Sequence, residues 1–133
     1  MTSLLQTTLY VDNVEKTIKF YTNIFGLKEI YISSKKNYGE LSLNGTILAF
    51  ASNKLANYNL KNGFTRSNIS EKPFGFELMF HTENVKEVMQ NAINAGAKEE
   101  EPVTRKPWMR EVGYLRDENG FLIEVCSFVK NNM

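Results

Sequence analysis

The sequence predicts an α+β domain built from two βαβββ modules that form a curved, mostly antiparallel eight-stranded sheet. The first indication is a faint internal repeat, in which residues 6–14 match residues 77–85 and residues 44–50 match residues 119–125. The second is an alternation of apolar and polar residues, which is typical of half-buried strands. The third is a helix-like apolar stripe after the first strand of each copy. A duplicated unit normally builds a pseudo-symmetric body, so we expect a site where equivalent elements of the two copies meet.

The first module spans about residues 4–53 and begins with an alternating strand over Leu4–Val11. Asp12 stands where a helix N-cap is expected, and Gly26 is expected to end that helix. The apolar stripe of the helix consists of Val14, Ile18, Tyr21 and Phe25. Three extended segments follow, at residues 27–33, 38–43 and 46–51. Asn44-Gly45 is a typical two-residue hairpin turn between the last two.

Residues 54–73 are polar and turn-rich, and they form the expected linker between the modules, long enough for a lid or a crossover. The second module, about residues 74–128, repeats the order strand, helix and three strands. Its helix begins at Asn84 and ends at Gly96. Its strands are expected at residues 76–81, 97–103, 110–116 and 121–128. At 133 residues, the two modules together make a single domain.

Composition excludes several classes of function. Sixteen basic and fifteen acidic residues leave a net charge of +1, which gives no electrostatic case for nucleic acid or an anionic membrane. The single cysteine, Cys126, excludes an internal disulfide framework and suits a reducing compartment. Residues 1–5 lack the features of a signal peptide, and no apolar stretch approaches membrane-spanning length. We therefore expect a cytoplasmic protein.

Strand parity predicts the position of the site. The apolar residues of the strand at 76–81 must face the helix, so Glu77 faces the opposite side of the sheet. The last strand places Glu124 on the same side, and the repeat adds Gln6 and Ala49 at the equivalent positions. A carboxylate inside a strand needs a partner, because an unpaired buried charge is costly.

Two solutions are open for these carboxylates. A divalent cation (Ni, Zn, Mn or Mg) could be held by Gln6, Glu77 and Glu124. Alternatively, no metal binds, and either one carboxyl is protonated or Arg110 pairs with it. Ala49 counts against the metal, because the fourth equivalent position carries no donor.

The histidine and the cysteine are expected to be structural. His81 lies four residues beyond Glu77, about 13 Å along an extended strand, so the two cannot share a metal. Cys126 follows Glu124 by two residues on the same face, and no histidine can be placed beside it to activate the thiol. We expect a strand-end histidine and a buried free thiol.

A rim of apolar and aromatic residues is expected around the carboxylates. Trp108 and Arg110 stand at a loop–strand junction and could offer an aromatic platform and one cation, although packing of Trp108 under the linker is equally expected. Met79 and Tyr10 point from strands toward the same side, and Phe64 in the linker could close over it. These five residues are the predicted ligand-binding set.

The chain resembles the vicinal oxygen chelate superfamily, which includes glyoxalase I, bleomycin and fosfomycin resistance proteins and extradiol dioxygenases. The resemblance covers residues 4–128 and rests on the duplicated βαβββ pattern, on Phe20-Tyr21 followed by Phe25-Gly26-Leu27, and on the ending from Asp117 through Gly120 to Ile123-Glu124. It implies the glyoxalase/bleomycin-resistance-like fold.

The resemblance also implies four metal positions, which fall on Gln6, Ala49, Glu77 and Glu124. Glu77 replaces what is usually histidine, and Ala49 replaces what is usually glutamate. Two functions are expected on this basis. One is a metal-dependent enzyme of lyase or isomerase type, which acts on a small substrate with vicinal oxygens and uses Glu124 or Glu77 to move a proton. The alternative is a metal-free protein that binds or sequesters a small drug or metabolite. A homodimer, which the resemblance implies, would cover exposed strand edges.

Overall fold

The chain forms two compact units, which are described here one at a time. A computed structural model describes residues 1–107 and 110–128, and the units are Met1–Arg66 and Ser67–Met133. In the first unit the elements are β1 (Thr7–Val11), α1 (Val14–Phe25), β2 (Lys28–Ile32), β3 (Tyr38–Leu43), β4 (Thr46–Ser52) and α2 (Asn53–Asn59). In the second they are β5 (Leu78–His81), α3 (Val85–Asn94), β6 (Lys98–Arg105), β7 (Glu111–Arg116) and β8 (Leu122–Cys126).

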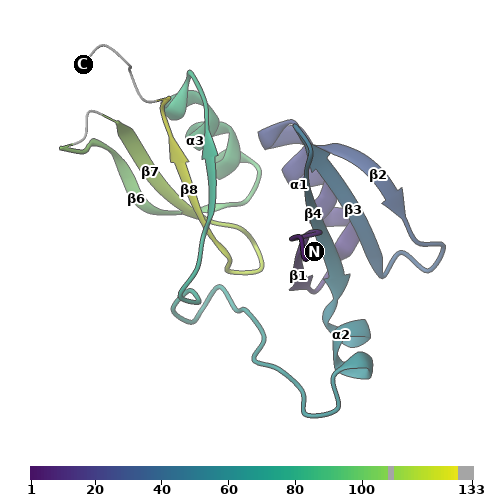
Figure 1. Ribbon diagram of the computed structural model, residues 1–133. Helices are drawn as coiled ribbons and strands as arrows, with labels where there is room; N and C mark the ends of the chain where they lie inside the picture. Colours follow the sequence, from purple (N-terminus) through teal and green to yellow (C-terminus); the bar gives the residue numbers. More distant parts are fainter. Residues whose placement is uncertain (108–109, 129–133) are drawn as a thin grey trace. The chain divides into compact units, whose positions relative to one another are not determined.

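The two units repeat one topology, so the prediction of two βαβββ modules is confirmed (Figure 1). The strand order is β1-β4-β3-β2 in the first unit and β5-β8-β7-β6 in the second. The first strand of each unit runs parallel to the last strand, and the other pairs are antiparallel. The eight strands therefore form two four-stranded mixed sheets, where the sequence analysis expected one sheet.

One face of each sheet packs on a helix and carries the core. In the first unit, Tyr21 of α1 stacks against Phe50 of β4 with ring centroids 5.1 Å apart, and both side chains are fully buried. In the second unit, α3 packs on β7, where a Cβ added to Gly113 would lie 2.7 Å from Cε of Met89. A side chain at position 113 would therefore require Met89 to shift. The other face of each sheet, opposite α1 in the first unit and opposite α3 in the second, is called the open face below.

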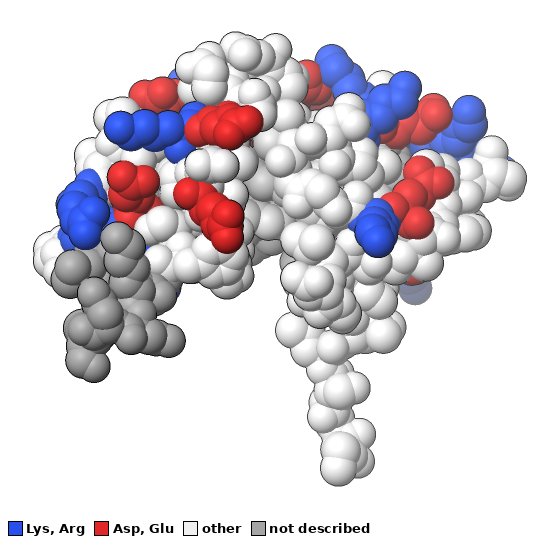
Figure 2. All heavy atoms as spheres, turned by 90° about the horizontal axis from the view of Figure 1, so that it is seen from above, with Lys and Arg blue, Asp and Glu red and all other residues white. Residues whose placement is uncertain are grey.

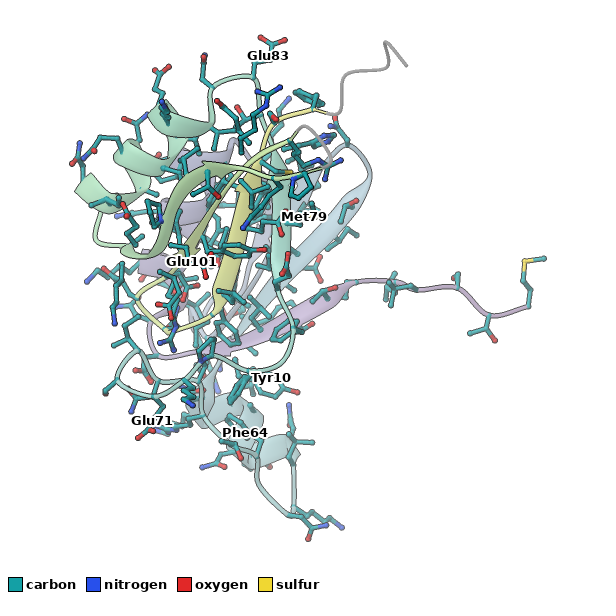
Figure 3. The ribbon with its side chains drawn as sticks, turned by 90° about the vertical axis from the view of Figure 1, so that its left-hand side faces the viewer. Tyr10, Phe64, Glu71, Met79, Glu83 and Glu101 are labelled. Atoms are coloured by element: carbon teal, nitrogen blue, oxygen red, sulfur yellow. The ribbon has the colours of Figure 1, made fainter. Side chains whose placement is uncertain are left out.

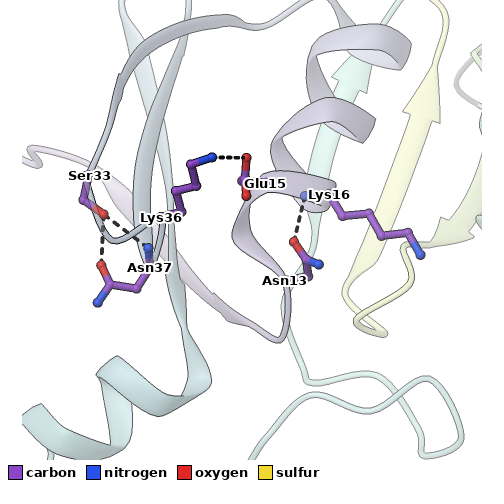
Figure 4. A network of polar contacts seen from close by, with 6 residues as sticks. All are labelled: Asn13, Glu15, Lys16, Ser33, Lys36 and Asn37. Atoms are coloured by element: carbon purple, nitrogen blue, oxygen red, sulfur yellow. Dashed lines mark hydrogen bonds and ion pairs between the residues drawn. The ribbon is translucent and has the colours of Figure 1, made fainter.

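The cap of α1 differs from the prediction by one residue. Asn13, not Asp12, is the N-cap, and its Oδ1 accepts a hydrogen bond from Lys16 N at 3.0 Å (Figure 4). Asp12 instead accepts a hydrogen bond from Asn53 Nδ2 at 2.6 Å. The expected end at Gly26 is confirmed, because this residue adopts the left-handed conformation with φ 75°.

The sequence analysis did not predict the helix α2, which overlaps the start of the expected linker. α2 is capped by Ser52, whose side chain accepts a hydrogen bond from Leu55 N at 3.0 Å. It buries Asn53 and Ala56. The remainder of the segment, through Lys72, contains no further helix or strand.

Two turns fix the geometry of the hairpins. Asn44 and Gly45 both have positive φ, 51° and 85°, as the predicted two-residue turn requires. In the second unit, Arg116 is 3% exposed and donates hydrogen bonds to the carbonyl oxygens of Gly120, Asn68 and Ile69. Arg116 thus ties the start of the second unit to the turn between β7 and β8.

Neither sign of charge dominates the face drawn in Figure 2. On the face drawn in Figure 2, acidic and basic side chains are interspersed over the described residues, in keeping with the net charge of +1. No helix in the described part of the chain has the length and apolar character needed to cross a bilayer.

Candidate functional site

The predicted carboxylates meet on the open face of the second unit. Glu124 lies in the middle of β8 and is 8% exposed, while the buried Ile123 and Val125 point to the helix side. Glu77 immediately precedes the first residue of β5, so it lies just before the strand and not inside it as predicted. It is exposed, and its carboxyl lies within hydrogen-bonding reach of Glu124.

Although the residue is exposed, partial desolvation of its carboxyl raises the pKa of Glu77, and the neighbouring Glu124 carboxyl raises it further, with desolvation the larger cause. Two carboxyls within hydrogen-bonding reach of each other resist simultaneous ionisation, because the second charge would repel the first. The contact with Glu124 therefore favours the protonated form of Glu77.

Tyr114 completes this centre from the neighbouring strand. It lies directly opposite Glu124 in the pairing of β7 with β8, and its hydroxyl donates a hydrogen bond to Glu124 Oε1 at 2.9 Å. Burial, the hydrogen bond to Glu124 and the charges of Glu124, Glu77 and Glu101 raise the pKa of Tyr114 to about 12. Tyr114 therefore remains a neutral donor throughout the physiological range.

Met79 supplies the apolar surface beside the carboxylates. It is the residue of β5 that pairs with Glu124, and its side chain is 50% exposed (Figure 3). The prediction that Met79 faces the same side as the carboxylates agrees with this pairing.

Arg110 and Cys126 pair with each other on this face. Arg110 Nη1 lies 3.8 Å from Cys126 Sγ, so the arginine contacts the thiol, and no ion pair with a carboxylate is found for it among the described residues. Burial raises the pKa of Cys126, and the positive charge of Arg110 opposes this only in part. The thiol is thus a buried, protonated group, as expected from the sequence.

His81 lies at the end of β5, as predicted. Its ring packs on Phe128 with centroids 4.1 Å apart. Trp108, the remaining predicted rim residue of this unit, lies outside the described residues.

In the first unit, Gln6 belongs to a chain of hydrogen bonds on the open face. Its Nε2 donates to Thr8 Oγ1 and to the hydroxyl of Tyr38, each at 2.9 Å. Tyr38 in turn donates to Glu40 Oε2 at 2.6 Å. Ala49 is fully buried and lies opposite Glu40 in the pairing of β3 with β4.

Tyr10 and Phe64 contact each other, as Figure 3 shows. Their ring centroids are 4.9 Å apart in an edge-to-face arrangement. Phe64 therefore packs beside β1 through Tyr10, and its predicted closure over a ligand stays a prediction.

The sequence analysis missed three polar residues of these faces: Tyr114, Tyr38 and Glu40. Alternation along β3 and β7 places Tyr38, Glu40 and Tyr114 on the open faces, so strand parity was the available signal. The pairing that sets Tyr114 opposite Glu124 and Glu40 opposite Ala49 depends on the register of β7 with β8 and of β3 with β4, which the sequence does not specify.

The donor set decides which cation could be held. Among the described residues, no three His, Cys, Asp or Glu side chains gather into one group. The second unit offers two carboxylates, from Glu77 and Glu124, and the first unit offers the amide of Gln6. Oxygen donors of this kind fit a hard cation such as Mg²⁺ or Mn²⁺ that retains several waters. They fit Zn²⁺ and Ni²⁺ less well, because those ions favour imidazole or thiolate.

The chain belongs to the Glyoxalase/Bleomycin resistance protein/Dioxygenase superfamily, which it matches over residues 3–125. No curated protein matches its sequence.

Solved structures of the same fold are similar to the chain over nearly its whole length. A glyoxalase-related enzyme from Fulvimarina pelagi is 19% identical with a TM-score of 0.80, and the match covers 96% of this chain and 89% of that one. A glyoxalase/bleomycin resistance protein/dioxygenase family enzyme from Burkholderia phytofirmans PsJN is 19% identical with a TM-score of 0.82, covering 97% and 100%. A lactoylglutathione lyase from Agrobacterium tumefaciens is 18% identical with a TM-score of 0.68, covering 96% and 94%. At these identities the likeness establishes the fold alone.

Proposed function

We propose that the chain binds a small molecule at the open face of the second unit, through a positively charged, hydrogen-bond-donating group of that molecule. The observation that carries this proposal is the contact between Glu77 and the buried Glu124, which also accepts a hydrogen bond from Tyr114. An amidinium or ammonium group would supply the positive charge that the carboxyl pair lacks. Met79 beside it would pack against the apolar part of the ligand.

Benzamidine and benzamide test this proposal, because they share a shape and differ in charge. Each is titrated into the ¹⁵N-labelled full chain, and binding is mapped by shifts of backbone amides. We expect benzamidine to shift the amides of Met79, Tyr114 and Glu124, and benzamide to leave them unchanged. Glu124→Gln should weaken benzamidine binding about tenfold or more, because it removes a charge-assisted hydrogen bond.

Glu83→Gln is the matched control. Glu83 is an exposed carboxylate of the same unit, in the turn between β5 and α3 (Figure 3). Its substitution changes the net charge equally and should leave benzamidine binding intact. Equal weakening in both variants would reduce the effect to general electrostatics and contradict a specific site.

A second candidate is a metal-dependent lyase or isomerase that acts on vicinal oxygens, with Gln6, Glu77 and Glu124 as the ligand residues. It is favoured by the convergence of the Glu77 and Glu124 carboxyls. A bound divalent cation would polarise the substrate oxygens. The protein's own part would be to hold the substrate beside Glu77 and Glu124 and to move a proton at one of their carboxyl oxygens.

Metal titration separates the two candidates. The pKa of Glu77 is raised, so a cation that binds the ionised pair should release protons when the pH lies near that pKa. Calorimetry with Mg²⁺, Mn²⁺, Ni²⁺ and Zn²⁺, repeated in buffers of different ionisation enthalpy, measures this release. Proton-linked binding that Glu124→Gln abolishes would favour the enzyme, and charge-selective benzamidine binding without metal affinity would favour the metal-free protein.

We also propose that the protein acts as a cytoplasmic homodimer. Each sheet has two edge strands, β1 and β2 in the first and β5 and β6 in the second. Pairing of two chains would cover such edges. Light scattering after size exclusion measures the assembly, and a monomer across the working concentration range would contradict it.

A further inference from the structure

The carboxylate of Glu40 lies on the open face of the first unit. Glu40 lies on β3, directly opposite Ala49 of β4, and both residues belong to the open face. Ala49 is the position equivalent to Glu124 in the sequence repeat. β4 thus carries alanine where the repeat has glutamate in the second unit, and the neighbouring strand β3 carries Glu40 beside that alanine.

Two aromatic side chains flank Glu40. Tyr31 of β2 is its cross-strand partner, and Tyr38 precedes it by two residues on the same strand, so all three side chains share one face. The rings of Tyr31 and Tyr38 have centroids 6.4 Å apart. Tyr31 is 51% exposed, so solutes can reach this position.

Two hydrogen bonds hold the Glu40 carboxylate in place. Tyr38 donates to Oε2 at 2.6 Å, and Gln6 orients Tyr38 by donating to its hydroxyl oxygen at 2.9 Å. No lysine or arginine forms an ion pair with Glu40 within the residues that the structure describes. Glu40 therefore combines a fixed, uncompensated negative charge with two adjacent aromatic rings.

We propose that Glu40, Tyr31 and Tyr38 form a binding site for an organic ammonium group. A carboxylate attracts a cation by charge, and aromatic faces attract it through the ring quadrupole, so the combination selects ammonium groups that carry alkyl substituents. A hydrated metal ion would gain little from the tyrosine rings. This site is built from residues of the first unit alone, and its proposal does not rest on the function proposed for the second unit.

Choline and its uncharged isostere 3,3-dimethyl-1-butanol are the probes. Each is titrated into the ¹⁵N-labelled full chain, and the shifts of the Tyr31, Tyr38 and Glu40 amides are followed. We expect choline to shift these amides saturably and the alcohol to leave them unchanged. Glu40→Gln should weaken choline binding about tenfold, and Tyr31→Leu should weaken it about threefold, since each removes one component of the attraction.

Glu15→Gln is the control. Glu15 is an exposed carboxylate of α1 in the same unit, and it pairs with Lys36 at 3.4 Å (Figure 4). Its substitution should leave choline binding unchanged. The amide spectrum of each variant verifies that it is folded. The proposal is overturned if choline shifts none of the three amides, if the alcohol binds equally well, or if Glu40→Gln and Glu15→Gln bind choline alike. A response of these amides to Mg²⁺ but not to choline would also overturn it.

Discussion

The substitution Glu124→Gln isolates the electrostatic part of the Tyr114 environment. Gln keeps the size of the side chain and can still accept a hydrogen bond, but it carries no charge. The Tyr114 hydroxyl donates to Glu124 Oε1 at 2.9 Å in the wild type. Ionisation of Tyr114 would place a second negative charge against this oxygen, which is why the contact raises its pKa.

The size of the effect follows from the causes that remain after substitution. The pKa of Tyr114 is raised from 10.0 to about 12, with burial as the largest cause and Glu124 as the next. Burial and the charges of Glu77 and Glu101 persist in the variant. We therefore expect the pKa to fall below about 12 but to stay above 10.0.

The assay is an alkaline titration of the protein labelled with ¹³C at the tyrosine ζ carbon. The chain has six tyrosines, so their signals can be separated, and Tyr114→Phe assigns the one of interest. Because the folded-state pKa is raised, the stability that this group contributes is complete below about pH 10 and is lost as the pH rises toward 12. Glu83→Gln serves as the control for net charge. An unchanged Tyr114 titration in Glu124→Gln would refute the assigned hydrogen bond.

Three further predictions concern stability and reactivity. The raised pKa of Glu77 contributes stability that is present below its ordinary value of 4.5 and is lost as the pH rises through the folded-state pKa. The free energy of unfolding of Glu77→Gln should therefore rise relative to that of the wild type between pH 4 and pH 7. The gain should be less than about 1 kcal/mol, because solvent screens the exposed group. Denaturant titrations at pH 4 and pH 7 measure this, and an equal difference between the two proteins at both pH values would contradict it. Gly120→Ala should destabilise by about 2–4 kcal/mol, since the residue has φ 93° and the new Cβ would lie 2.7 Å from the backbone of Asn68. Gly45→Ala, with φ 85° and no atom within 4 Å, should lose only about 1–2 kcal/mol in the same unfolding assay, and similar losses would show that the close approach is unimportant. Iodoacetamide at pH 7.5 should alkylate Cys126 at least about tenfold more slowly than free cysteine, because burial raises its pKa; mass spectrometry over time measures this, and equal rates would refute the buried thiol.

Sequence predicted the architecture because the signals involved are local or repeated. Alternation identified the strands, and Asn44-Gly45 identified a hairpin whose positive φ angles only such residues adopt readily. The cap of α1 was misplaced because Asp12 and Asn13 are equally suitable residue types. In the folded chain Asp12 instead accepts a hydrogen bond from Asn53, which lies 41 residues away in the sequence, and Asn13 is left as the cap. Such a contact exists only once the chain has folded.

The short helix α2 was missed for a related reason. Its seven residues are mostly polar, and an isolated helix of this length is not stable in water. It is held by its Ser52 cap and by burial of Asn53 and Ala56, and burial is a tertiary effect that the local sequence does not encode.

For the site, strand parity correctly placed the acidic residues on one face, but it could not supply their neighbours. Tyr114 and Glu124 meet because the register of β7 with β8 sets them opposite each other. Glu40 meets Ala49 by the register of β3 with β4. A shift by one residue would have turned these side chains to the helix side.

A pH titration of the carboxyl carbons, with ¹³C at the glutamate δ position, tests the central claim most directly. Glu77→Gln and Glu124→Gln assign the two signals. If the Glu124 carboxyl raises the pKa of Glu77, the Glu77 signal titrates above 4.5 in the wild type and moves back toward that value in Glu124→Gln. A Glu77 signal that titrates at its ordinary value in both proteins would contradict the account.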